Sequence, residues 1–330
     1  MLVCTFSSLI LPSCAPPAPP HAEAATPLEA VVASQPRPNV ILSQEPWTYG
    51  TSRGVIVRTP SYRLFTTISD ETLRQRLPVF LELAGAQYRS AITPLSSPAL
   101  ALDTYVMADR TQWERIVSQL LGSRSDLISS MSRGGFTLNA RSILYELGPR
   151  DTLVLLAHEG WHQFAQGSFK EPLPIWLDEG LATWFEGHRW SGVVPVFTPS
   201  DNPDRLDALI RAARSNTLIP LDQLVSTTPQ EWISLGGDRA LTYYAQVWAL
   251  TRFLTEHPTR RDALANILTL ASRGQMRAEL SRRVGDRAAG IAMSRRLGPA
   301  VLESFIDRDQ AALQRAYDAF IESLTSPPAR

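Results

Sequence analysis

Residues 151–164 read DTLVLLAHEGWHQF. The stretch consists mostly of good helix formers, and Asp151 is a residue type that caps helix N-termini. We therefore expect a helix from about Asp151 to Gln166. His158 and His162 lie four positions apart in it, and such positions share one face of a helix at a separation of roughly 6 Å. Both imidazoles can therefore reach one metal ion.

Glu159 follows the first histidine directly and points about 100° around the helix from it. That direction is poor for a third ligand, but it suits a base that takes a proton from a water molecule at the metal. Two histidine ligands and a glutamate base on one helical turn form the HExxH pattern of zinc-dependent hydrolases. The pattern also arises by chance, so the interpretation depends on a third ligand.

A second predicted helix follows closely, because LPIWLDEGLATWFEG (173–187) has helical character and ends at Gly187. The intervening QGSFKEPLPI lets this helix fold back across the first one. Asp178 and Glu179 lie near its start, and a carboxylate from this helix would complete a site with three protein ligands. A fourth position left open for water is typical of a catalytic zinc.

The remaining elements predict an α+β fold. The first half combines a mixed sheet with helices, and the second half, from about Ser200, is mostly helical. In the first half we expect strands at 62–68 and 99–108, helices at 70–92 and 110–121 with Asp70 as an N-cap, and a hairpin or long strand at 134–147.

The start of the chain, residues 1–25, is interpreted as a signal or lipoprotein segment. MLVCTFSSLILPSC is apolar, carries no charge and is too short to span a bilayer. Leu11–Cys14 resembles a bacterial lipoprotein box, with Cys14 as the lipidated residue. The alternative is an ordinary signal peptide that is cut after Ala24. Both interpretations predict export to the bacterial cell envelope or periplasm, with a lipid anchor only in the first.

Composition limits the kinds of partner and metal ligand that the chain is expected to use. The formal net charge is zero, so nothing favours nucleic acid, which requires clustered excess Lys and Arg. Both cysteines, Cys4 and Cys14, lie in the first segment, so thiolate metal ligands are excluded from the body of the chain. Residues 26–55 are rich in Pro and Ala and are expected to form a tether.

AHEGWHQF followed by LPIWLDEGLATWFE resembles the gluzincin metallopeptidases, in particular the bacterial peptidase MA-like families. Their pattern is HExxH and then Trp-Leu-x-Glu-Gly-Leu-Ala on the next helix, where the glutamate before Gly-Leu-Ala is the third zinc ligand. It matches Glu179. The resemblance covers roughly residues 60–260, and its specific part is 134–187. Metzincins are excluded, because Ala165 and Ser168 occupy the positions of that class's glycine and third histidine.

The resemblance implies a zincin-like catalytic subdomain at residues 56–195, followed by a helical subdomain at 196–330. It implies one Zn²⁺ per chain, held by His158, His162 and Glu179, and a peptide or protein substrate. Two histidines and a glutamate can also hold cobalt or manganese. The resemblance further suggests that Asp178 and Thr183 are polar groups around the ligands, with Asp178 the first candidate to orient a histidine.

Hydrolysis also requires a donor to the oxyanion of the tetrahedral intermediate. Tyr243 and Tyr244 are the candidates, and Tyr244 is preferred; core packing is the alternative role for this pair. The main hypothesis is a zinc metallopeptidase with Glu159 as general base and Tyr244 as donor. The alternatives are a non-catalytic zinc-binding scaffold of the same fold and an envelope interaction protein that recruits a partner through its helical half.

Overall fold

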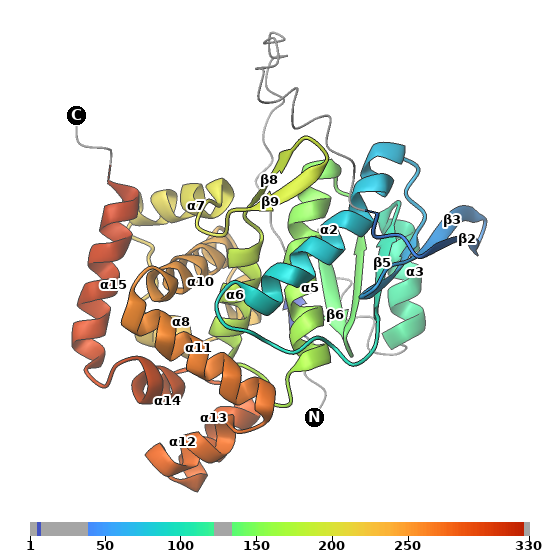
Figure 1. Cartoon of the computed structure of the whole chain (residues 1–330). Helices are drawn as coiled ribbons and strands as arrows, with labels where there is room; N and C mark the ends of the chain where they lie inside the picture. Colours follow the sequence, from blue (N-terminus) through green and yellow to red (C-terminus); the bar gives the residue numbers. More distant parts are fainter. Residues whose placement is uncertain (1–4, 8–38, 122–133, 327–330) are drawn as a thin grey trace.

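The computed structural model describes residues 5–7, 39–121 and 134–326 (Figure 1). In these residues, seven strands form one mixed sheet in the order β1-β6-β7-β5-β4-β3-β2, and two strands, β8 and β9, form a separate hairpin. The strands are β1 (Thr5–Ser7), β2 (Ser43–Tyr49), β3 (Ser52–Arg58), β4 (Tyr62–Thr66), β5 (Leu102–Met107), β6 (Gly135–Leu138), β7 (Arg141–Tyr145), β8 (His188–Ser191) and β9 (Val194–Phe197).

Helices cover both faces of the large sheet. Strands β4, β5 and β7 run parallel, and the first connection between them is helix α2 (Glu71–Ser90), because parallel neighbours need a long crossover. Helices α2 and α5 (Pro149–Ser168) lie on one face, and α3 (Arg110–Leu121) lies on the other. Along β5, Val106 faces the first layer and Met107 the second, as the two-residue period of a strand requires.

The second half is helical and lies beside the sheet, in yellow to red in Figure 1. Buried side chains of both halves belong to one continuous cluster, so the helical region shares its core with the sheet region. The helices are α6 (Ile175–Phe185), α7 (Pro203–Arg214), α8 (Leu221–Ser226), α9 (Pro229–Ser234), α10 (Arg239–Thr255), α11 (Pro258–Arg273), α12 (Met276–Val284), α13 (Asp286–Arg295), α14 (Pro299–Val301), the π-helix η2 (Leu302–Ile306) and α15 (Gln310–Thr325).

The predicted α+β class and mixed sheet are confirmed. Asp70 caps α2, because its carboxylate accepts a hydrogen bond from the backbone N–H of Leu73 at 2.9 Å. The end of the predicted tether is wrong, since residues 43–55 form β2 and the start of β3. The predicted signal and lipoprotein features around Cys14 and Ala24 lie outside the described residues. None of the described helices is both long and apolar enough to span a bilayer.

Helix α5 is buried almost all round, since α2, the sheet and α6 enclose it. Its start differs from the prediction: Gly148, with φ of 92°, is the N-cap, Pro149 begins the helix, and Asp151 lies in the first turn. The neighbouring α2 approaches closely at Gly160, where an added Cβ would lie 2.7 Å from the Tyr88 hydroxyl. That hydroxyl donates to the carbonyl of Ala157 at 2.8 Å, which ties α2 to the centre of α5.

We predict that Gly180→Ala destabilises the protein by about 1–3 kcal/mol, because α6 crosses α10 at this glycine. An added Cβ would meet the Thr251 hydroxyl and lie 2.9 Å from the carbonyl oxygen of Val247. Gly290→Ala, on α13, is the matched control, since its Cβ would find only the Arg277 guanidinium at 3.7 Å. Urea unfolding measures both; equal stabilities for the two variants would contradict close packing at this crossing.

Candidate metal centre

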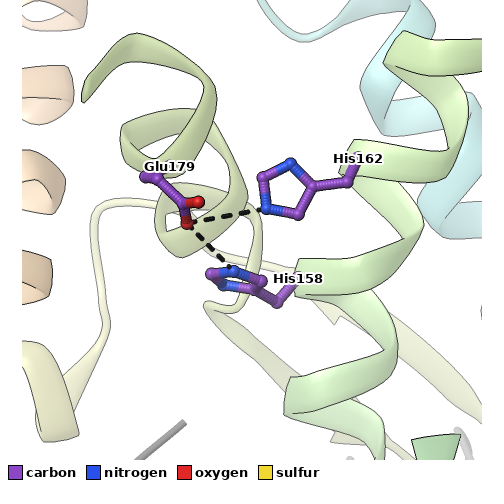
Figure 2. A group of neighbouring side chains, drawn as sticks. All are labelled: His158, His162 and Glu179. Atoms are coloured by element: carbon purple, nitrogen blue, oxygen red, sulfur yellow. Dashed lines mark ion pairs between the residues drawn. The ribbon is translucent and has the colours of Figure 1, made fainter. Parts of the chain in front are cut away.

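His158, His162 and Glu179 converge from two helices on one point (Figure 2). Glu179 Oε2 lies 3.4 Å from His158 Nε2 and 3.6 Å from His162 Nε2. Ligand atoms bound at 2.0–2.2 Å around a tetrahedral ion lie about 3.4 Å apart, so this spacing suits a zinc-sized cation. This His–His–Glu group is fully buried and could hold a metal ion.

Glu186 fixes the ring of His158 from behind. Its Oε1 lies 2.8 Å from His158 Nδ1, which leaves Nε2 to face Glu179. Arg205 forms two hydrogen bonds to the Glu186 carboxylate, at 2.8 and 2.6 Å, and Asn202 donates a third at 2.9 Å. A carboxylate on the far nitrogen of a ligand histidine sets its tautomer and orientation, and the guanidinium compensates the buried charge.

Asp178 faces the far nitrogen of His162 at ion-pair distance. Its Oδ1 lies 3.2 Å from His162 Nδ1 and accepts a hydrogen bond from the Trp161 indole at 2.9 Å. Its other oxygen accepts a hydrogen bond from Arg296 at 2.5 Å. Each histidine thus has its own carboxylate, and each carboxylate has its own arginine.

The buried charges of the described residues all lie at this site. They comprise four carboxylates and two guanidiniums, which leaves a deficit of two positive charges. We call these six residues the buried charge cluster: Glu159, Asp178, Glu179, Glu186, Arg205 and Arg296. Buried charge is costly unless it is compensated, so the deficit can be met by one divalent cation or by protons on the two histidines and on Glu159.

Without a metal, the surroundings of both histidines favour their protonated forms. Burial alone would lower the pKa of His158, but hydrogen bonds to Glu179 and Glu186 outweigh it and raise the pKa. Burial also opposes the charge on His162, yet Asp178 and Glu179 raise its pKa well above the ordinary value. Metal ligation requires neutral imidazoles, so a cation would replace these protons and release them.

Glu159 lies beside the His–His–Glu group and is fully buried. Its Oε2 accepts a hydrogen bond from the Thr137 hydroxyl at 2.8 Å, whereas Oε1 has no hydrogen-bond partner among the described residues. Burial raises its pKa to about 7, against the lowering effect of both histidines. A carboxyl group with this pKa can both accept and donate a proton near neutral pH.

The other predicted residues differ in their surroundings. Tyr243 and Tyr244 are buried, and their hydroxyls make no hydrogen bond within the described part of the chain. The ring of Tyr244 lies edge-on to His158 with centroids 6.1 Å apart, which brings it to the site. Among the described residues, the Thr183 hydroxyl donates only to backbone carbonyls of its own helix, those of Glu179 and Gly180, so it does not orient a histidine.

The sequence interpretation missed Thr137, Glu186, Arg205 and Arg296. A local signal existed for Glu186, because it lies seven positions after Glu179 and so shares a face of the same helix. No local pattern points to Arg205 or Arg296, which reach the site through tertiary packing.

Residues 153–276 match the model of a family described as a protein of unknown function (DUF1570). The match covers less than half of the chain. It contains the His–His–Glu group, Glu186, Arg205 and both tyrosines, but it ends before Arg296. No curated protein and no solved structure matches the chain.

We predict that Glu159→Gln stabilises the metal-free protein more at pH 8 than at pH 5. The pKa of Glu159 rises from 4.5 to about 7 on folding, so the folded state binds the extra proton between these values. Its contribution to the free energy of unfolding therefore falls as pH rises through this window, by at most about 3 kcal/mol. Because glutamine does not ionise, the Glu159→Gln variant should not lose stability in this way as pH rises.

Urea unfolding with a chelator at both pH values tests this prediction. Thr152→Ser, a buried change on the same helix outside the charge cluster, serves as a control and should show the same small difference from wild type at both. A pH-independent effect of Glu159→Gln would contradict the raised pKa.

Proposed function

We propose that the protein is a zinc-dependent hydrolase, most plainly a peptidase of the gluzincin type. The observation that carries this proposal is the buried charge cluster, which lacks two positive charges. Within it, Glu179 Oε2 lies 3.4 and 3.6 Å from the Nε2 atoms of His158 and His162, distances that suit a zinc ion between them. A purely structural role for the metal would not require the buried carboxylate of Glu159 beside it.

A divalent metal held by His158, His162 and Glu179 would polarise a water molecule and the substrate carbonyl. Glu159 would accept the proton of the attacking water through Oε1, which has no partner among the described residues, while the Thr137 hydroxyl donates to Oε2. Glu159 would then pass this proton to the leaving nitrogen, the second half of a general acid–base role.

Tyr244 is proposed as the donor to the developing oxyanion. Burial and the nearby Glu179 raise its pKa well above 10, so its hydroxyl remains protonated at every physiological pH. Buried hydroxyls normally have a hydrogen-bond partner, and this one has none among the described residues. A substrate oxygen at the site would supply one.

A peptide is the proposed substrate because of strand β6. Gly135 and Thr137 of β6 lie against Glu159: an added Cβ at Gly135 would lie 3.2 Å from Glu159 Cγ. On the side away from β7, β6 pairs antiparallel with Thr5–Ser7 of the predicted signal segment, so this side of β6 holds an extended backbone. A peptide substrate would take the place of that segment and lie along the site. Action at the bacterial envelope or in the periplasm follows from the signal segment and remains part of the proposal.

We predict that the purified wild type binds about one zinc per chain and that Glu179→Gln loses most of it, because two neutral imidazoles alone hold zinc weakly. Elemental analysis after dialysis measures the content. Glu171→Gln, in the loop between α5 and α6, is the control and should retain zinc, because this half-buried carboxylate bonds backbone N–H groups at the start of α12 and not the metal centre. Wild-type protein without zinc, even when zinc is supplied, would exclude a metal hydrolase.

We predict that Glu159→Gln retains zinc but loses at least 100-fold in peptide hydrolysis, since proton transfer alone contributes about 10²–10⁴-fold. Tyr244→Phe should lower kcat by about 10²-fold with little change in KM, whereas Tyr243→Phe should change it less. A library of fluorogenic peptides supplies the assay. Zinc-loaded wild type that cleaves no peptide would favour the non-catalytic scaffold.

A further inference from the structure

Arg296 enters the metal centre from a distant part of the chain. It follows α13 directly, 118 residues after Asp178 in sequence, and it is 7% exposed. Its backbone is left-handed, with φ of 54°. Such a conformation is uncommon for a residue other than glycine, and it costs free energy unless surrounding contacts compensate it.

The backbone N–H of Arg296 caps α13, since it donates to the carbonyl of Met293 at 3.3 Å. The side chain and the carbonyl of Arg296 contact the start of α6, the helix that carries Glu179. The Arg296 guanidinium donates through Nε to the carbonyl of Leu173 at 2.7 Å and through a terminal nitrogen to Asp178. Its own carbonyl accepts the backbone N–H of Ile175 at 3.0 Å. One residue therefore satisfies a loop carbonyl, an otherwise unpaired N–H of the first helical turn and the carboxylate that faces His162.

The next residues hold Arg296 in this position. An added Cβ at Gly298 would overlap the Trp176 indole and lie 2.7 Å from the carbonyl of Val225, so the chain passes α6 in direct contact. The backbone N–H of Gly298 donates to that same carbonyl at 2.9 Å. Residues 296–298 thus form a clamp on α6 that is built into the fold.

The arginine that supports the His158 side of the site comes from another part of the chain. Arg205 belongs to α7 and reaches His158 through two hydrogen bonds to Glu186. The two His–carboxylate–arginine relays therefore start from different carboxylates and meet only at Glu179 and the two histidine rings.

We propose that Arg296 is a positioning residue of the metal centre, which acts on His162 through Asp178 and thereby makes the C-terminal helical region part of the metal site. The proposal rests on the proposed metal-binding function. It extends the site beyond residues 153–276, the segment that matches the family model. The forked guanidinium of an arginine can donate to the Leu173 carbonyl and to the Asp178 carboxylate at the same time, which a lysine could not do.

A double-mutant cycle tests the proposal, with the zinc dissociation constant from competition with a chromophoric chelator as readout. Arg296→Met and Asp178→Asn should each weaken zinc binding by about 10–100-fold, the usual loss for partners of ligand histidines. Because Arg296 acts through Asp178, the double variant should bind zinc no more weakly than Asp178→Asn alone. In a double variant with Glu186→Gln, by contrast, Arg296→Met should weaken zinc binding by the same factor as it does alone.

Two further variants keep the test decisive. Arg295→Met, at the exposed neighbouring position, should leave the dissociation constant within twofold of wild type. Arg296→Lys keeps the positive charge and should weaken zinc binding less than Arg296→Met does. If circular dichroism shows that Arg296→Met does not fold, Arg296→Lys takes its place in the cycle.

Losses that add in the Arg296 and Asp178 cycle, or an Arg296→Met protein with wild-type affinity, would overturn the proposal. Wild-type protein that binds no zinc would overturn it together with the proposed function. Wild type that binds zinc but cleaves no peptide would remove the hydrolase and leave the role of Arg296 standing.

Discussion

Unbalanced charge away from water is the constraint on which this structure depends. Four carboxylates and two guanidiniums are buried together, and the hydrophobic layers around them exclude the solvent that would otherwise screen them. The cost of this arrangement is acceptable only if a dication or two protons complete it. Tight crossings of α5 with α2 and of α6 with α10 keep the groups at fixed distances, so compensation and geometry are set by the same packing.

The parts predicted from sequence are those with a local cause. The Asp70 cap, the helix that carries His158 and His162, and the strands β4 and β5 all follow from short-range patterns. β2 was missed for a physical reason: it ends the sheet, most of its residues are exposed, and it contains Pro46, so it lacks the apolar alternation of a central strand. The cap of α5 was misassigned because Gly148 and Pro149 begin the helix before Asp151 does.

The residues of the site divide in the same way, into those with a local sequence signal and those without one. HExxH marks two histidines and a base, and the following helix offers two carboxylates, so the His–His–Glu group could be chosen from the sequence with the aid of a family resemblance. The groups that hold these residues in place could not. Arg205 and Arg296 are ordinary arginines in their own segments, and their roles exist only after α7 and the end of α13 pack against α6. Local patterns identify the reactive groups, whereas tertiary contacts determine their orientation.

The separation of Arg296 from the rest of the centre in sequence has a consequence for biosynthesis. A chain is made from its N-terminus, and early segments can begin to fold before later ones emerge. The three residues of the His–His–Glu group all precede residue 180, but the arginine that bonds Asp178 is synthesised 118 residues after it. A nascent chain would therefore carry this group without its complete support, and the buried charge cluster would be complete only after Arg296 has been made.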